Sequence, residues 1–261
     1  MNDTLHTLGV SRRRFSTIVG AAFSWLAVGD ACRAGESSQG TDGRLKATPR
    51  GRVTTSGERE RALGLDRRRD GILKLPATAA DGPLPLFIFL HGAGGSGQGV
   101  LRRLGSAADE AGVAVLAPDS RDSTWDGIRG EFGADVAFLD RALERTFEQV
   151  SVDATRIAVG GFSDGATYAL SLGLINGDLF RRIVAFSPGF VVDGQPHGKP
   201  RIFISHGTSD PILPIDQCSR RIVPGLRRLG YDVTYKEFNG RHEVPPAIAA
   251  EGMRWIAAAA D

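Results

Sequence analysis

The sequence predicts an α/β protein with a mostly parallel central sheet and helices on both faces. From about residue 67 onward, short apolar segments alternate with amphipathic ones, which is the pattern of repeated strand–helix units. The segment 84–90 is almost entirely apolar, as expected of a strand that is buried on both faces. The chain has 261 residues, of which 41% are hydrophobic, so one domain of this length can bury a large core.

The expected strands begin with the short apolar segment 72–75 and the longer segment 84–90. The next four are 113–117, 156–161, 182–187 and 200–205. Segment 231–238 alternates apolar and polar residues, which predicts a strand nearer an edge of the sheet. Residues 35–60 are rich in Gly, Ser, Thr and Arg and predict a linker with at most one edge strand, near residues 45–48.

The clearest expected helix covers residues 135–150. Its apolar residues recur every three or four positions and therefore share one face. These residues are Val136, Leu139, Leu143, Phe147 and Val150. The other expected helices are 100–111, 163–176, 216–229 and 245–259.

The net charge of +2 has a local origin. Residues 1–34 contain four arginines and two aspartates, and the remaining chain is balanced. Without a basic field there is no electrostatic reason to expect a nucleic-acid partner. With only two cysteines, Cys32 and Cys218, clusters of cysteine that bind metal are excluded.

Residues 1–34 are typical of an export signal. Ser11-Arg12-Arg13-Arg14-Phe15 precedes the apolar run 18–28, which is too short to span a bilayer but suits a signal peptide of the twin-arginine type. Gly29 and Ala31 are small residues at −3 and −1 of a cleavage point before Cys32, and Cys32 itself is a candidate for lipidation. The segment therefore predicts a protein exported from a bacterial cell to the periplasm or beyond, without a stable membrane span.

The strongest chemical signal is Gly161-Phe162-Ser163-Asp164-Gly165, a G-x-S-x-G motif between an expected strand and an expected helix. A turn this sharp needs residues without bulk on both sides of the serine. It places the serine oxygen above the sheet, at a helix N-terminus that favours negative charge. Ser163 is the candidate nucleophile.

A serine nucleophile needs a base, and the base needs an acid that orients it. Asp210 follows strand 200–205 and His242 follows strand 231–238, in the chain order Ser, Asp, His that such sheets use. Asp193 is the rival acid, but its loop follows the preceding strand. His91 and His206 directly follow strands and precede glycines, and we interpret them as packing or supporting residues.

The loop His91-Gly92-Ala93-Gly94-Gly95 follows strand 84–90 and can present free backbone N–H groups. We predict an oxyanion hole formed by the amides of Ala93 and Asp164. The rival interpretation, a phosphate-binding loop, fails because the G-x-x-x-x-G-K-[ST] pattern and a nearby lysine are missing from the sequence.

These motifs resemble the α/β-hydrolase superfamily. The match lies in four segments: 91–96, 161–166, 206–211 and 240–244. Within the superfamily the chain is similar to the small phospholipase/carboxylesterase group and its dienelactone-hydrolase-like and polyhydroxybutyrate-depolymerase-like relatives. The resemblance covers residue 67 to the end. It implies the α/β-hydrolase fold and a serine carboxylesterase that works through an acyl-enzyme without metal or organic cofactor.

The connection 188–199 is too short for a helical cap, so we expect no large cap domain and an open site. Candidate walls are Trp125, Phe190, Ile212 and Leu213. An open site suits small esters or the ends of an ester polymer. Two other interpretations remain: an amide or peptide hydrolase with the same triad, and a non-catalytic envelope binding protein on a hydrolase scaffold.

Overall fold

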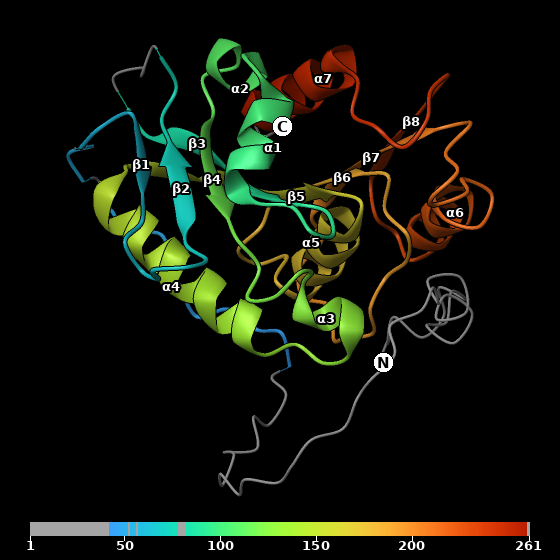
Figure 1. Cartoon of the computed structure of the whole chain (residues 1–261), viewed down its shortest axis with the longest axis horizontal. Helices are drawn as coiled ribbons and strands as arrows, with labels where there is room; N and C mark the ends of the chain where they lie inside the picture. Colours follow the sequence, from blue (N-terminus) through green and yellow to red (C-terminus); the bar gives the residue numbers. More distant parts are fainter. Residues whose placement is uncertain (1–41, 52, 56, 78–81, 260–261) are drawn as a thin grey trace, which may run out of the picture.

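The computed structural model describes residues 42–51, 53–55, 57–77 and 82–259. The expected signal segment 1–34, with Cys32, lies outside these residues. From residue 61 onward, the described chain forms the α/β architecture that the sequence predicts (Figure 1).

The described chain forms an eight-stranded sheet in the order β1-β2-β4-β3-β5-β6-β7-β8. The strands are β1 (Glu60–Ala62), β2 (Gly71–Lys74), β3 (Leu84–Leu90), β4 (Ala114–Pro118), β5 (Val152–Phe162), β6 (Arg182–Phe186), β7 (Arg201–Gly207) and β8 (Val233–Phe238). The ladders from β4 to β8 are parallel, whereas β2 pairs antiparallel with both β1 and β4. Strands β3, β4 and β6 are buried along their whole length, which explains their continuous apolar runs.

Helices cover both faces of the sheet (Figure 1). One face carries α1 (Gly97–Leu104), α2 (Ala107–Glu110) and α7 (Pro246–Ala257), whose buried residues form one apolar core. The other carries α3 (Asp126–Arg129), α4 (Ala134–Gln149), α5 (Asp164–Ile175) and α6 (Ser219–Arg228), which line a second and larger core. This arrangement is the two-sided layering expected of a parallel sheet.

The segment before the sheet differs from the expected linker. Residues 45–48 form no strand, and the edge strand β1 lies at Glu60–Ala62 instead. Leu45 and Ala47 are buried, and their amides donate to Asn176 of the loop after α5 and to Asp140 of α4. The described part of this segment is therefore anchored to the domain by contacts that its polar composition did not reveal.

Two helices also differ from the sequence prediction. The expected helix 100–111 is divided into α1 and α2, because Gly105 ends α1 with a φ of 56°. The short helix α3, at Asp126–Arg129, was not predicted. Its first residue, Asp126, accepts the amides of Gly133 and Asp135 at the start of α4 and so ties the two helices together.

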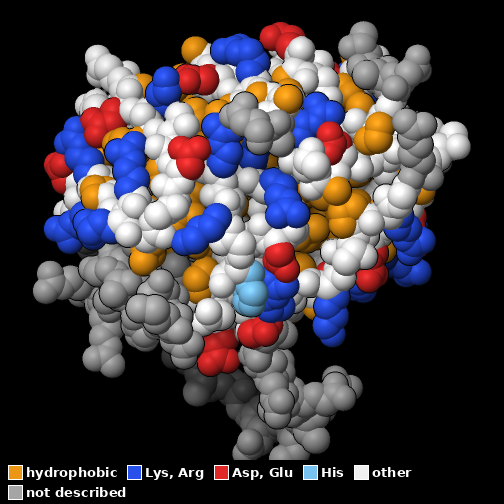
Figure 2. Space-filling view, turned by 180° about the vertical axis from the view of Figure 1, so that it is seen from behind, with side chains coloured by type: hydrophobic (Ala, Val, Ile, Leu, Met, Phe, Trp, Pro, Cys, Tyr) orange, Lys and Arg blue, Asp and Glu red, His pale blue; other side chains and the backbone are white. Residues whose placement is uncertain are grey.

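Charged side chains of both signs are interspersed on the face shown in Figure 2. This distribution fits the balanced charge of the sequence after residue 34. No helix of the described chain is long and apolar enough to cross a membrane.

Candidate active site

The sheet brings the predicted site residues together at the carboxyl ends of its parallel strands. Leu90 of β3 pairs with Gly161 of β5, and Phe162 of β5 pairs with Phe186 of β6. The chain leaves β3 toward β4 on one side and returns to β5 on the other, so the loops after β3 and β5 meet where the strand order reverses. Crevices of open α/β sheets form at such positions.

Ser163 occupies a sharp turn between β5 and α5. Its φ of 58° and ψ of −122° lie in a region that L-residues rarely adopt. A Cβ on Gly161 would lie 2.2 Å from the carbonyl carbon of Gly165, and a Cβ on Gly165 would lie 2.2 Å from the oxygen of Leu90. Both glycines are therefore required by close backbone approach, and the turn holds the serine hydroxyl above the sheet.

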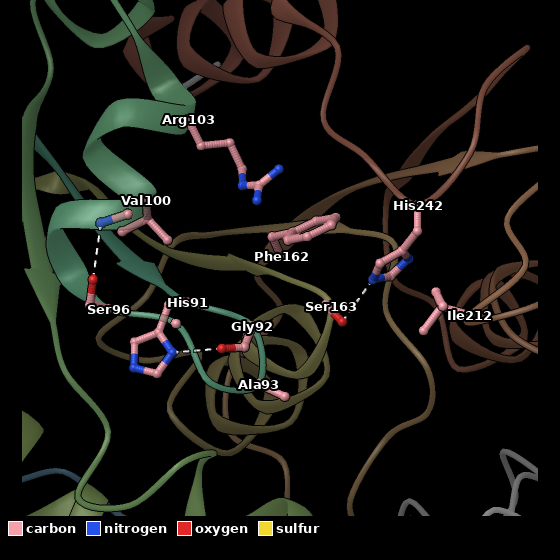
Figure 3. A pocket seen from close by; sticks show the side chains of 12 residues that line it. His91, Gly92, Ala93, Ser96, Val100, Arg103, Phe162, Ser163, Ile212 and His242 are labelled. Carbon is pink, nitrogen blue, oxygen red and sulfur yellow. Dashed lines mark hydrogen bonds between the residues drawn. The ribbon is translucent and has the colours of Figure 1, made fainter. Parts of the chain in front are cut away.

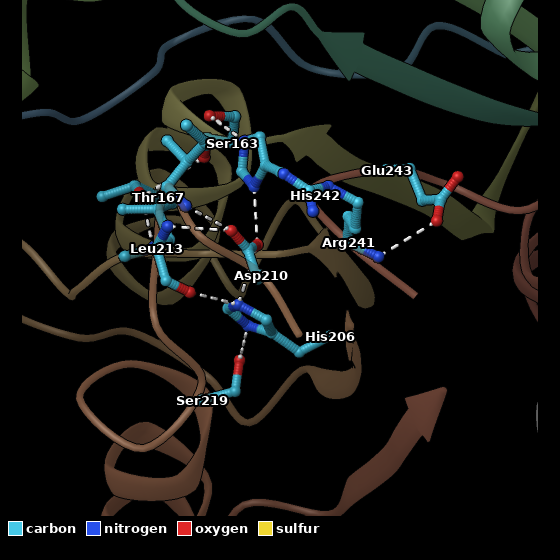
Figure 4. A network of polar contacts seen from close by, with 11 residues as sticks. Ser163, Thr167, His206, Asp210, Leu213, Ser219, Arg241, His242 and Glu243 are labelled. Atoms are coloured by element: carbon cyan, nitrogen blue, oxygen red, sulfur yellow. Dashed lines mark hydrogen bonds and ion pairs between the residues drawn. The ribbon is translucent and has the colours of Figure 1, made fainter. Parts of the chain in front are cut away.

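Ser163, His242 and Asp210 form a continuous hydrogen-bonded chain (Figure 4). His242 Nδ1 lies 2.6 Å from Asp210 Oδ2, and His242 Nε2 lies 2.8 Å from Ser163 Oγ. An ionised carboxylate can only accept, so Nδ1–H donates to Asp210 and Nε2 accepts the serine hydroxyl proton. This is the orientation in which the imidazole can act as a general base toward Ser163.

Asp210 is held by four contacts. Its Oδ1 accepts the amides of Ile212 and Leu213, each at 2.9 Å, while its Oδ2 lies close to both His242 and His206. Burial acts to raise the pKa of Asp210, but the hydrogen bonds from Leu213, His242 and Ile212 lower it below its usual value. The carboxylate is therefore ionised and fixed in orientation.

His206, expected directly after a strand, instead lies within β7 near its carboxyl end and is fully buried beneath Asp210. Its Nε2 lies 2.8 Å from the Leu213 carbonyl, which can only accept, so Nε2 carries the proton. Its Nδ1 accepts from the Ser219 hydroxyl at 2.7 Å. Burial lowers the pKa of His206, and both ring nitrogens are occupied. Its geometry is that of a support for Asp210.

His91 also supports the site and has no free ring nitrogen. The Ser120 amide donates to His91 Nε2 at 2.9 Å, so His91 Nδ1–H donates to the Gly92 carbonyl at 2.7 Å. Burial lowers the pKa of His91. These bonds fix the loop that carries Ala93.

The two amides predicted to form an oxyanion hole come from loops that touch. Gly92 lies so close to the serine turn that a Cβ there would approach Ser163 Cβ to 3.1 Å. Among the described residues, the amides of Ala93 and Asp164 donate no hydrogen bond. The carboxylate of Asp164 accepts a hydrogen bond of 2.6 Å from Thr124 Oγ1. Neither N–H group is therefore committed to an acceptor among the described residues.

A cavity of about 340 Å³ opens onto Ser163 and His242 (Figure 3). Ile212 is 63% exposed and lies at its rim, as one of the predicted walls. The other three predicted walls do not line it. Trp125 is fully buried and donates its indole N–H to the His91 carbonyl. Phe190 is half-buried and packs against the larger core, and Leu213 is half-buried and donates its amide to Asp210.

The residues that line the cavity without having been predicted from the sequence include Val100, Arg103 and Phe162. The Phe162 ring packs against the His242 ring at a tilt of 38°, with 4.7 Å between centroids, and the Arg103 guanidinium lies 4.3 Å from the Phe162 centroid. A signal was present in the sequence, because Val100 and Arg103 are three residues apart and therefore lie on one side of α1.

Arg69 is not simply solvated at the surface, because its guanidinium contacts residues of the loops beside the site. Its guanidinium reaches Ser120 Oγ at 3.2 Å and lies 3.5 Å from His91 Nε2. It therefore braces the loops that follow β3 and β4 from the turn before β2.

The Phospholipase/Carboxylesterase family profile matches residues 115–257. The chain is 31% identical over 157 residues to a protein of Aspergillus oryzae described as "Probable feruloyl esterase C". It is 29% identical over 161 residues to feruloyl esterase C of Emericella nidulans. Each match covers 57% of this chain and 57% of the relative, so the similarity spans little more than half the length of these curated relatives.

Solved structures share the fold. The chain superposes on esterase PE8 with a TM-score of 0.59 and 23% identity, covering 73% of this chain and 98% of that one. For the Bacillus cereus carboxylesterase the TM-score is 0.55 at 21% identity, covering 72% and 93%. At these identities the likeness establishes the architecture, while the site must be interpreted from the side chains of this chain itself.

Proposed function

This chain belongs to the phospholipase/carboxylesterase family of α/β-hydrolases, and we propose that it hydrolyses carboxylic esters through an acyl-enzyme formed on Ser163. The observation that carries the proposal is the hydrogen-bonded chain from Asp210 through His242 to Ser163, with contacts of 2.6 and 2.8 Å. Asp210, His242 and Ser163 follow β7, β8 and β5, respectively, and all lie at the carboxyl ends of these parallel strands.

The mechanism follows from the donors and acceptors of the site. Ser163 Oγ attacks the ester carbonyl while His242 Nε2 takes the hydroxyl proton, and His242 then gives this proton to the departing alcohol. A water molecule attacks the acyl-enzyme, His242 takes its proton, and the acid leaves as that proton returns to Ser163. Asp210 stabilises the charged imidazole, and the amides of Ala93 and Asp164 stabilise the oxyanion.

The site favours small, accessible esters. Residues 187–200, all of them described, form neither helix nor strand, so no helical cap covers the cavity from this connection. Since two relatives are named feruloyl esterases, feruloyl esters belong in the first substrate panel. Phe162, Val100 and Ile212 offer apolar surface for an aromatic acyl group.

A fluorophosphonate probe combined with a panel of p-nitrophenyl and feruloyl esters tests the proposal. We expect the probe to label the wild-type protein on Ser163, and esters to turn over much faster than the matching anilides. Labelling on another residue, or faster cleavage of the anilide, would contradict an esterase that uses Ser163. A protein that neither reacts with the probe nor turns over an ester would be the non-catalytic binding protein.

We further propose that the N-terminal segment 1–34 directs export of the protein and that residues 61–261 form the catalytic domain. The support is the sequence Ser11-Arg12-Arg13-Arg14-Phe15 before a short apolar run. Replacing Arg12 and Arg13 by lysine should trap the unprocessed protein in the cytoplasm. Intact-mass measurement of the exported form should find an N-terminus between about residues 30 and 36. A diacylglycerol adduct on Cys32 would assign a lipoprotein, whereas an exported protein that retains Met1 would contradict the proposal.

A further inference from the structure

One positively charged side chain, that of Arg103, lines the active-site cavity but has no part in the proposed catalysis by the triad. Arg103 lines it together with Ser163 and His242, from the last turn of α1. Figure 3 shows its guanidinium directed over the Phe162 ring, on the side of the cavity opposite Ile212. Phe162 also packs against the His242 ring at a tilt of 38°, so one aromatic ring contacts both the guanidinium and the proposed general base.

Arg103 has no anionic partner among the residues that the structure describes. The carboxylates of helices α2 and α7, the elements beside α1 on this face of the sheet, have other partners. Asp109 of α2 pairs with Arg59 and Lys74, Glu110 accepts from Ser106, and Glu251 of α7 pairs with Lys236. The cavity lining includes one arginine and two histidines but no aspartate or glutamate.

Arg103 is an exposed residue whose guanidinium lies over an aromatic ring of the cavity wall. Its carbon lies 4.3 Å from the Phe162 centroid, which is a cation–π geometry. Burial lowers the pKa of Arg103, although arginine remains charged at any physiological pH. A positioned cation without a counter-ion stabilises an anion that enters the cavity.

We propose that Arg103 selects esters that carry a carboxylate, such as half-esters of dicarboxylic acids or short hydroxyacid oligoesters with a free acid end. This inference rests on the proposed esterase function. A single guanidinium matches the charge and planar shape of one carboxylate, with two parallel N–H···O bonds. The cavity of about 340 Å³ suits a small ester. The corresponding diester, in which both carboxyl groups of the dicarboxylic acid are esterified, lacks the charge and should be the poorer substrate.

The test compares matched anionic and neutral esters. For a charge on the leaving group, the pair is 4-acetoxybenzoate and 4-acetoxybenzamide, and for a charge on the acyl group it is monoethyl adipate and ethyl adipamate. The measured quantity is the ratio of kcat/KM for the anionic ester to that for its neutral partner. We expect wild type to favour the anionic ester in one pair, which also identifies the side of the ester that faces Arg103.

Arg103→Gln should lower this ratio about tenfold, mainly through KM, since a hydrogen bond to a charged group is lost. Arg103→Lys should restore part of it. The matched control is Arg102→Gln, which removes the adjacent, exposed arginine of the same helix and should leave the ratio unchanged. Raising the salt concentration should reduce the wild-type ratio but not that of Arg103→Gln.

Two results would overturn the inference. One is hydrolysis of all four esters with a ratio that Arg103→Gln leaves unchanged, and the other is an equal loss in Arg102→Gln, which would indicate a diffuse effect of net charge. If wild type hydrolyses none of the four esters and resists the fluorophosphonate probe, the proposed function fails, and the inference fails with it.

Discussion

The end of β7 and the loop after β8 each bring one histidine to the same carboxylate oxygen, yet the two histidines can do different chemistry. His242 lies 2.6 Å from Asp210 Oδ2 and its side chain is 15% exposed, whereas His206 lies 3.2 Å away and is fully buried. His242 keeps Nε2 directed at Ser163, while His206 uses both nitrogens on Leu213 and Ser219. The partners of the second ring nitrogen therefore distinguish a general base from a support.

Among the changes proposed here, loss of Ser163 or His242 should lower activity the most. Ser163→Ala and His242→Ala should each lower kcat by something on the order of 10⁴- to 10⁶-fold, because the two groups act as one unit. The double variant should be barely slower than either single variant. Steady-state kinetics on a soluble ester measures this, with circular dichroism as the control for folding. A double variant whose losses multiply would show that the two residues act separately.

Asp210→Asn should cost less, on the order of 10³- to 10⁴-fold in kcat. The amide has one acceptor oxygen in place of two, so it cannot serve His242 and the amides of Ile212 and Leu213 together. Asp193→Asn is the matched control, since Asp193 is the rival acid from the loop after β6 and should retain near wild-type kcat. Loss of activity in Asp193→Asn with retention in Asp210→Asn would reverse the assignment of the acid.

His206 should matter to stability more than to the chemical step. His206→Phe leaves the Leu213 carbonyl without its buried donor, which should cost about 1–3 kcal/mol of unfolding free energy. We expect kcat to fall no more than about a hundredfold, because His242 still contacts Ser163 and Asp210. His206→Gln, which supplies a donor, should lose less of both. If His206→Phe were as inactive as His242→Ala while remaining folded, the distinction between the two histidines would be wrong.

The smallest expected effect is a pH dependence of stability. Burial lowers the pKa of His91 and His206, so below about pH 6.5 the unfolded chain binds protons that the folded chain does not, and stability falls as the pH falls. Asp135 opposes this trend, because burial raises its pKa to about 6 and the folded chain then takes up a proton between pH 6 and 4.

The Tm measured from pH 8 to pH 5 should therefore decline, and the decline should be steeper in Asp135→Asn, which no longer titrates. It should be shallower in His206→Gln, where one of the two buried histidines is gone. An unchanged slope in both variants would show that other groups control the acid stability of the fold.

Most of the strands and helices, and the three candidate residues Ser163, Asp210 and His242, could be proposed from the sequence because the patterns that mark them are local. An all-apolar run identifies β3, and Gly161 and Gly165 are forced by atoms that lie within a few residues or on the adjacent strand. The loop positions of Asp210 and His242 follow from the rule that parallel strands place their carboxyl ends together.

What the sequence by itself determined is thus the fold class, the serine turn and the candidates for acid and base. Only the tertiary structure decided that Trp125 is buried under the site instead of lining it and that Arg103 lines the cavity beside Phe162. It also decided that Leu45 and Ala47 are anchored to the loop after α5 and to α4. The physical reason is that burial and hydrogen-bond partners depend on contacts between residues far apart in the chain, such as Trp125 with His91 and Leu45 with Asn176. Local patterning carries no record of such contacts.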